Sequence, residues 1–314
     1  MTWLLQPNIF TDSLFNKTFV MKFKYLLFLF YIFLIGIVFP PTEINATNPD
    51  NELKMWMLSD IQPRKQSERK DFERAIKDIN KNVKDIDFAI VAGDIVDRAT
   101  NSSFDWYIDT RNKSYIKKWY EIAGNHDLKP DEGLLFKEKL NENLNYSIIR
   151  NNLLIILMSD EKRSSATDIS DDTFKWWKEL VVQNQDKIII VVTHAPLNGS
   201  GITFSSFERR HIIDSKRFRK VLNKYGVDLW ISGHLHIPHS IKNNLTNRPE
   251  YKNTVFLNIS SVRTELLGFK DSESFIISLK CGSNILDMKS RNHTKAKYNS
   301  NQIYNYRLGK NYLC

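Results

Sequence analysis

Cysteine is scarce in this chain of 314 residues, which contains only Cys281 and Cys314. Two cysteines so far apart cannot form a CxxC metal site or a disulfide-dense scaffold. A single bridge between them would suit an oxidising compartment, but their spacing leaves open whether they pair. Glycine (11 residues) and proline (9 residues) are too few for a collagen-like or linker-dominated chain.

The composition is otherwise that of a globular protein. Hydrophobic residues make up 42% and charged residues 26% of the chain, which excludes a disordered or fibrous protein. A chain of this length also buries enough apolar surface for a sizeable core.

Acidic residues are outnumbered by basic ones, 36 against 45, which gives a formal net charge of +9. A positive excess suits an anionic partner such as nucleic acid, anionic lipid or a phosphate-bearing substrate. The same excess arises in any chain from a lysine- and asparagine-rich proteome. The net charge therefore does not choose between these alternatives.

Long hydrophobic runs are rare, and the clearest run, Tyr25–Phe39, lies near the start of the chain. Lysines precede this run and Pro40-Pro41 follows it, an arrangement typical of an export signal. Its fifteen residues fall short of the roughly twenty that a membrane-spanning helix needs. We therefore interpret residues 1–46 as a signal peptide or a membrane anchor.

Two details of this segment stay open. Met21 is a candidate for the true start, and Ile44-Asn45-Ala46 is a candidate cleavage site. With or without cleavage, we expect the remaining chain to lie outside the cytoplasm, either secreted or anchored to the membrane by the N-terminal segment. The polar residues 47–53 then form a tether.

Residues 54–314 alternate short apolar runs with helical patterns, which is typical of a single α/β domain. We expect three helices: one over 67–80, one that begins after a cap at Ser170, and one over 215–225. A polar tail is expected at the C-terminus. The predicted strands are Met55–Leu58, Phe88–Ala92, Trp119–Ala123, Leu153–Met158, Lys187–Val192, Val227–Ile231, Thr254–Ile259 and Phe275–Leu279.

Five of these predicted strands end in a cluster of polar residues. Four of the seven histidines fall inside these clusters. Ligand sites in open α/β sheets lie beyond the carboxyl ends of the strands, so we expect the clusters to form one site. The clusters are Asp60-Ile61-Gln62, Gly93-Asp94-Ile95-Val96-Asp97-Arg98, Gly124-Asn125-His126-Asp127, Thr193-His194 and Gly233-His234-Leu235-His236.

Asp, Asn, Gln and neutral His together form a mixed oxygen and nitrogen ligand set. Such a set suits Mn, Fe, Zn or a similar divalent ion rather than calcium or a thiolate-bound metal. If one carboxylate bridges, the set suffices for two ions about 3.5–4 Å apart, an arrangement that hydrolyses phosphate esters.

The motifs GDxxDR, GNHD and GHxH stand in this order along the chain. In this set and order the sequence, from about Lys54 to Pro238, resembles the calcineurin-like metallophosphoesterase superfamily. The resemblance implies a four-layer α-β-β-α sandwich of two mixed sheets flanked by helices. It also implies a phosphoesterase that uses two divalent metal ions and a bridging hydroxide to hydrolyse a phosphomonoester, a phosphodiester or a nucleotide pyrophosphate.

The resemblance also implies roles for individual residues. Asp60, Gln62, Asp94 and His236 would hold the first ion, and Asp94, Asn125, His194 and His234 the second. The catalytic residues would be His126, which protonates the leaving oxygen, Asp127, which orients the His126 ring, and Arg98, which together with Asp97 supports the site.

One residue departs from the family pattern. The first family motif is usually Asp-x-His, whereas this chain has Gln62 in the place of the histidine. Glutamine offers a neutral oxygen instead of an imidazole nitrogen, so the change bears on the first metal and not on the fold.

Residues outside the motifs carry weaker expectations. His211, His239 and His293 are expected on the surface or in loops, with His239 also close enough to His236 for a substrate contact. The basic residues of one segment are expected to form a solvated helix face, with a phosphate or anionic-lipid contact as the alternative. They are Arg209, Arg210, Lys216, Arg217, Arg219 and Lys220.

Two other functions stay open: a nuclease of the same superfamily, and a non-catalytic protein-binding scaffold with the same fold. The expected partner is a phosphorylated small molecule, a nucleotide or a lipid head group, with a membrane contact through the N-terminal segment. The export segment disfavours nucleic acid. Specificity is expected to lie in loops such as Asn198–Arg210 and in the C-terminal tail, where no motif names the substrate.

Overall fold

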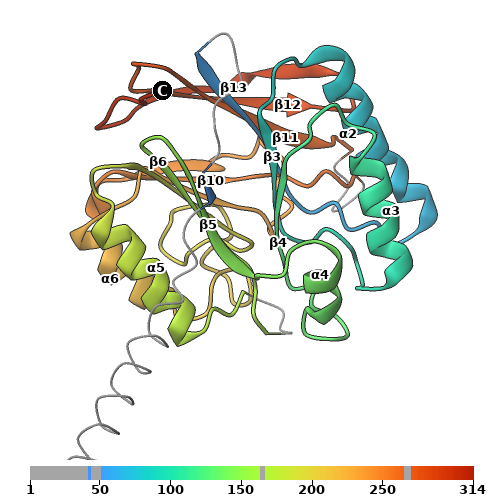
Figure 1. Cartoon of the computed structure of the whole chain (residues 1–314), viewed down its shortest axis with the longest axis horizontal. Coiled ribbons are helices and arrows are strands. Elements are labelled where there is room, and N and C mark those ends of the chain that lie inside the picture. Colours follow the sequence, from blue (N-terminus) through green and yellow to red (C-terminus); the bar gives the residue numbers. More distant parts are fainter. Residues whose placement is uncertain (1–41, 44–50, 163–166, 265–269) are drawn as a thin grey trace, which may run out of the picture. The chain divides into compact units, whose positions relative to one another are not determined.

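The computed structural model describes residues 42–43, 51–162, 167–264 and 270–314, which all belong to one compact unit, Pro41–Cys314 (Figure 1). The apolar run Tyr25–Phe39, Met21 and the candidate cleavage site lie outside these residues. Within the described ranges, no helix has both the length and the apolar character needed to cross a bilayer.

Two mixed sheets form the centre of this unit. The seven-stranded sheet has parallel strands in its middle and antiparallel pairs β5–β6 and β9–β10 toward its edges. Its order is β1 (Thr42–Glu43), β5 (Asn145–Arg150), β6 (Leu153–Met158), β7 (Ile188–Thr193), β8 (Leu229–Ser232), β10 (Thr254–Asn258) and β9 (Leu245–Arg248).

The six-stranded sheet joins a parallel half to an antiparallel half. Strands β2, β3 and β4 run parallel, and β2, β11, β12 and β13 pair antiparallel. Its order is β13 (Lys297–Arg307), β12 (Ile285–Asn292), β11 (Glu273–Lys280), β2 (Glu52–Leu58), β3 (Phe88–Ala92) and β4 (Trp119–Ile122).

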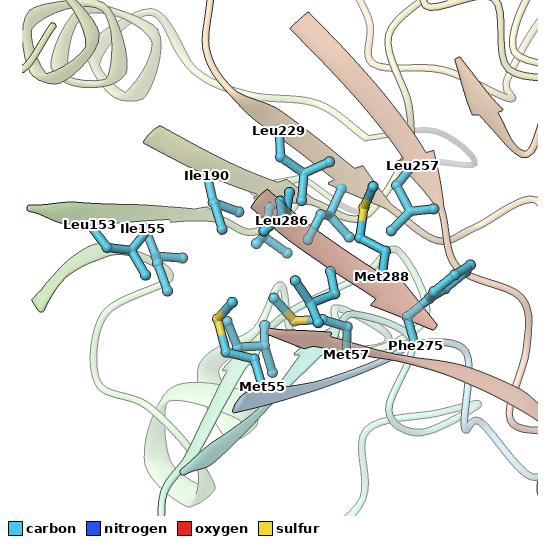
Figure 2. Packing of buried hydrophobic residues seen from close by; sticks show 14 of the residues in the cluster. Met55, Met57, Leu153, Ile155, Ile190, Leu229, Leu257, Phe275, Leu286 and Met288 are labelled. Atoms are coloured by element: carbon cyan, nitrogen blue, oxygen red, sulfur yellow. The ribbon is translucent and has the colours of Figure 1, made fainter. Parts of the chain in front are cut away.

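Apolar side chains fill the space between the sheets (Figure 2). Successive strand residues point to opposite faces. Met55 and Met57 of β2 therefore join Ile155 and Ile190 of the other sheet in this inner core, whereas Trp56 belongs to a separate cluster.

Helices cover the outer faces of both sheets. Phe72 of α2 packs in one cluster with Trp56, and Trp177 of α5 packs with Trp230 in another. Figure 1 shows α2 and α3 on one side of the unit and α5 and α6 on the other, so the predicted four-layer α-β-β-α sandwich is confirmed. The helices are α2 (Arg69–Asn82), α3 (Asn101–Arg111), α4 (Leu134–Lys139), α5 (Asp171–Gln183) and α6 (Ser215–Lys224).

The predicted polar tail is wrong, because Ile285–Asn292 and Lys297–Arg307 form strands β12 and β13. Strand β12 alternates buried Leu286 and Met288 with less buried polar residues, as in a strand with one face toward the core. Strand β2 begins at Glu52, so Glu52 and Leu53, the last two residues of the expected tether, belong to the strand.

The two cysteines of the chain are paired. Cys281 and Cys314 form a disulfide, with Cα atoms 5.6 Å apart. The bridge fastens the C-terminus to the end of β11.

Candidate metal centre

The polar clusters predicted to meet do meet, at the carboxyl ends of β2, β3, β4, β7 and β8. Backbone hydrogen bonds tie the loops together. The Asp60 N–H donates to the carbonyl of Gly93 over 3.1 Å, and the Gly233 N–H donates to that of His194 over 2.8 Å. The site is therefore built where the ends of parallel strands converge, as open α/β sheets favour.

Two groups of possible metal ligands lie in this site. One contains Asp94, His194 and His234, and the other contains Asp60, Asp94 and His236. In each group the ligand atoms all lie within 4.8 Å of one another, and every member is buried. Because Asp94 belongs to both groups, the two form one continuous cluster.

Two amide side chains complete the cluster's donor set. The Gln62 Nε2 atom lies 2.9 Å from Oδ2 of Asp94 and 2.9 Å from Nε2 of His236. Oε1 of Gln62 and Oδ1 of Asn125 are buried, and no described residue donates a hydrogen bond to them. A buried polar atom without a partner is costly, so these oxygens are suited to a cation. The residues present thus fit divalent metal ions.

The histidines are held in tautomers that suit metal binding. Nδ1 of His194 lies 2.8 Å from the carbonyl oxygen of Ala92, and Nε2 of His234 lies 3.0 Å from that of Arg209. A carbonyl only accepts, so these nitrogens carry the protons. The opposite nitrogens, His194 Nε2 and His234 Nδ1, lie 3.2 Å from each other, and each would act as a ligand in its deprotonated form.

The backbone at this site is strained. Asp60, Asp94, His234 and His236 have φ angles of 55°, 53°, 67° and 52°, in the left-handed region that residues other than glycine seldom adopt. At Gly124 a Cβ would collide with the Asp94 carboxylate. Strain of this kind clusters at functional sites, where the surrounding structure has to maintain it.

Negative charge in the cluster centres on two carboxylates, that of Asp94, which both groups share, and that of Asp60. Burial alone would raise the pKa of Asp94, but attraction to His194 outweighs it and holds the pKa well below its usual value. His236 lowers the pKa of Asp60 against burial in the same way. Burial and repulsion from His194 lower the pKa of His234 to about 4, so this ring is neutral at pH 7.

The sequence profile described as calcineurin-like phosphoesterase matches residues 53–238, more than half of the chain. The chain belongs to the calcineurin-like phosphoesterase family. No curated protein matches the sequence.

Solved structures with the same fold are distant in sequence. The purple acid phosphatase PPD1 from yellow lupin (Lupinus luteus) is 13% identical with a TM-score of 0.61, and the match covers 79% of this chain but 52% of that one. The phosphoesterase chain therefore spans about half the length of the lupin protein. GAP50 of Plasmodium, described as the anchor in the inner membrane complex, is 15% identical with a TM-score of 0.57, covering 83% of this chain and 90% of that one.

His126 lies beside the cluster but is held differently from the expectation. Its backbone N–H donates to Oδ1 of Asp94 over 2.9 Å, and its ring Nδ1 lies 3.0 Å from the carbonyl oxygen and 3.3 Å from Oδ1 of Asp97. The side chain is 24% exposed, unlike the buried ligands. Asp97, and not Asp127, therefore orients the ring in this phosphoesterase.

Asp127 has a different position from the one expected. Its carboxylate is buried and accepts from the backbone N–H groups of Ile95, Val96 and Gly124 at 2.8–3.1 Å. Burial, with the charge of Asp94, raises its pKa to about 7. Asp127 thus fastens the GDxxDR loop to the GNHD turn, because its short side chain reaches these amides.

Arg98 is exposed, and within the described ranges its side chain makes no hydrogen bond or ion pair. The cation beside Asp97 is instead Arg64, whose Nε lies 3.6 Å from Oδ1 of Asp97. The structure thus brings together six of the seven predicted ligands. Asn125 lies between Gly124 and His126, which both adjoin Asp94, and Arg98 stays exposed.

Two residues near the metal centre, Asp160 and Arg263, were not predicted from the sequence. Asp160 is the second residue after β6. Its N–H donates to the carbonyl of Ala123, and burial raises its pKa to about 7. Arg263 is buried and donates from Nη1 to the carbonyl of Gln62 over 2.8 Å. The rule of polar residues after a strand, applied also to Leu153–Met158, would have found Asp160.

His239 and His293 lie in loops, as one of the two expectations had it, but both are buried and neither is on the surface. His239 accepts the N–H of Ser260 at Nε2 and contacts Ser290 through Nδ1, so it is a neutral ring within the fold. His293 lies 2.8 Å from Oδ2 of Asp78. Neither residue belongs to the two ligand groups of the described structure.

Proposed function

We propose that this phosphoesterase is an exported enzyme with two divalent ions that hydrolyses a phosphomonoester, a phosphodiester or a nucleotide pyrophosphate. One observation carries the proposal. Asp94 is common to two buried ligand groups, and beside them Gln62 and Asn125 offer oxygens without hydrogen-bond donors.

The proposed ligand sets follow from these groups. Donors of this kind suit Mn, Fe or Zn. When bound, such ions supply Lewis-acid polarisation of the ester and activate water at neutral pH. The first set is Asp60, Gln62, Asp94 and His236, and the second is Asp94, Asn125, His194 and His234.

His126 is the proposed proton donor. Contact with Asp97 at Nδ1 leaves Nε2 on the opposite edge of the ring, and the side chain is accessible from solvent. The protonated ring can donate from Nε2 to the leaving oxygen as the ester bond breaks. Its backbone N–H holds Oδ1 of Asp94, which fixes the ring relative to the ligands.

Two observations support export. The apolar run Tyr25–Phe39 follows clustered lysines, and Cys281 and Cys314 form a disulfide. Disulfides persist in oxidising compartments and are rare in the cytosol. The N-terminal segment would act either as a cleaved signal or as an anchor.

The test combines metal removal with a general ester assay. The purified protein is assayed on 4-nitrophenyl phosphate and bis(4-nitrophenyl) phosphate, before and after chelation, and after adding Mn. We expect chelation to abolish hydrolysis and Mn to restore it. Asp172→Asn, at an exposed position on α5, serves as the control for Asp94→Asn. Hydrolysis that survives both chelation and Asp94→Asn would overturn the proposal.

The same assay, with DNA as a further substrate and a measurement of bound metal, addresses the two alternatives. A protein-binding scaffold is the second candidate, favoured by the description of the similar Plasmodium structure as an anchor. A scaffold would fold normally, bind no metal and cleave no ester. Cleavage of DNA in preference to small esters would identify a nuclease.

A further inference from the structure

Two phenylalanines are exposed on a loop beside the metal centre. Phe204 is 44% exposed and Phe207 is 59% exposed, and they are the only phenylalanines exposed to this degree among the described residues. Their ring centroids lie 5.5 Å apart with an interplanar angle of 31°, so the rings form one contiguous aromatic surface. We call this pair the aromatic platform.

The loop beneath the platform is fixed by buried residues. Ile202, Ser205 and Ile212 are buried, and the Ile212 N–H donates to the carbonyl of Pro196 over 2.8 Å. Phe204 has a φ angle of 68°, which is strained for a bulky side chain. Strain kept at an exposed aromatic residue points to a function, because burial of this ring does not compensate for it.

The platform is coupled to the metal centre through the backbone. The Arg209 carbonyl oxygen accepts from Nε2 of His234 at 3.0 Å. Arg209 follows Phe207 by two residues, and two residues of chain span at most about 7 Å. The backbone that carries Phe207 therefore lies close to His234.

Charge on the same loop complements a phosphate ester. Arg209 and Arg210 are exposed directly after the platform, and Glu208 is the one acid beside them. Guanidinium groups pair with phosphate oxygens, and aromatic faces stack with planar rings. The loop thus offers one surface for the anion and another for a flat leaving group.

We propose that Phe204 and Phe207 bind a planar ring in the leaving group, so that the preferred substrate is an aryl or nucleoside phosphate. This proposal rests on the proposed function of the adjacent centre and narrows its substrate class. A ring is favoured over an alkyl chain because the surface consists of two aromatic faces next to guanidinium groups, which stack on rings.

The test compares esters with and without a ring. For the parent, Phe204→Ala and Phe207→Ala, kcat/KM is measured on AMP, 4-nitrophenyl phosphate and glycerol 2-phosphate, each variant relative to the parent on the same ester. We expect about a 5- to 50-fold loss on AMP, mainly in KM, from loss of stacking. The change on glycerol 2-phosphate should be less than about threefold. Phe207→Tyr should restore the AMP value, whereas Phe207→Leu should not.

Controls separate this inference from the function on which it rests. Ile303→Ala removes an apolar side chain that is 44% exposed on β13. This variant should leave kcat/KM at the parent value on all three esters. AMP binding measured by calorimetry reports on the platform even if the parent hydrolyses no ester, an outcome that would refute the proposed function alone. Equal losses on all three esters, unchanged AMP affinity in both alanine variants, or a preference for long-chain alkyl esters would overturn the inference.

Discussion

The Nε2 atom of Gln62 lies 2.9 Å from Oδ2 of Asp94 and 2.9 Å from Nε2 of His236. The Gln62 side chain thus contacts Asp94, the residue that the two ligand groups share. Gln62 occupies the position where the family usually has histidine. A half-turn of the amide exchanges Oε1 and Nε2, so Gln62 can present an oxygen to the same point. The departure from the family motif therefore changes the ligand chemistry without removing a donor.

Gln62→His should raise the affinity for the first ion, because imidazole binds such ions better than a neutral amide does. Gln62→Ala should lower that affinity by about tenfold or more, as losses around metal sites do. Isothermal titration calorimetry, with Mn added to protein from which metal has been removed by a chelator, measures the affinity of the parent and of both variants. Superimposable titration curves for the parent and the two variants would remove Gln62 from the ligand set.

His126→Ala should lower kcat by about 10²–10⁴ on an alkyl phosphate, the usual contribution of general acid catalysis. The loss should be smaller on 4-nitrophenyl phosphate, because nitrophenolate leaves without being protonated. Metal content should match the parent. An equal loss on both esters would indicate charge stabilisation instead of proton donation, and a metal-free variant would place His126 in support of the ligands.

Asp97→Ala should reproduce part of the His126→Ala loss, since Asp97 contacts Nδ1 of His126 through its carbonyl and its carboxylate. The backbone carbonyl remains in the variant, so we expect a loss of about 3- to 30-fold in kcat, below the full range for a general acid. The pH profile of kcat on the alkyl ester should shift as well. Asp127→Asn is the comparison, and its effect should be on stability. A pH profile identical to the parent's in Asp97→Ala would contradict the role of Asp97.

A buried ionic cluster joins α2 to β12, where Asp78 accepts from Arg291 over 2.5 and 2.8 Å and contacts His293 over 2.8 Å. Burial opposes ionisation, but hydrogen bonds from Arg291 and His293 outweigh it and lower the pKa of Asp78. A lowered pKa contributes stability that is present above the usual value near 4 and lost below it. For His293, burial itself lowers the pKa. The stability that comes from keeping this ring neutral is therefore lost as pH falls below about 6.5, the usual pKa of histidine.

The stability that this cluster adds should therefore fall as pH decreases from 7 to 3. It is measured as the free energy of unfolding of the parent minus that of Asp78→Asn. Asp78→Ala should lower the free energy of unfolding by about 3–5 kcal/mol at pH 7, because it leaves a buried guanidinium unpaired. Asp78→Asn should flatten the dependence of that free energy on pH below pH 4. Urea unfolding of the parent and of both variants at pH 7, 5 and 3 measures these effects. A difference between the parent and Asp78→Asn that is the same at each pH would contradict the argument.

Cys281→Ser should lower the free energy of unfolding by about 2–4 kcal/mol, since the bridge closes a long loop of the unfolded chain. Cys314→Ser and the double variant should give the same loss, because each removes the same bridge. Dithiothreitol should destabilise the parent and leave the variants unchanged. Equal stability of parent and variants would show that the bridge contributes nothing.

The sequence predicted the fold well where strands are wholly buried. Phe88–Ala92 and Leu153–Met158 are continuous apolar runs, and their strands have the predicted bounds. Strand β13 was missed because it lies at a sheet edge, with mostly exposed polar residues. Helix α3 was missed because its apolar residues follow no clear helical period, and its start depends on a local cap by Thr100.

The site shows the same division. Asp94 and His234 could be found because side-chain type and position after a strand identify them. Arg209 could not, since the atom that contacts His234 is a backbone carbonyl, which every residue has. Asp97 was assigned only a supporting place because its contact with His126 depends on how two loops fold against each other.

Asp94 carries the central claim, since the two ligand groups share its carboxylate. The most direct test is the metal content of the purified protein and of Asp94→Asn, measured by inductively coupled plasma mass spectrometry after loading with Mn and desalting. We predict close to two ions per chain in the parent, as a two-metal centre requires. Asp94→Asn should lose most of both ions, because the buried cluster holds no second shared carboxylate. One ion or none in the parent, or two ions in Asp94→Asn, would contradict the account.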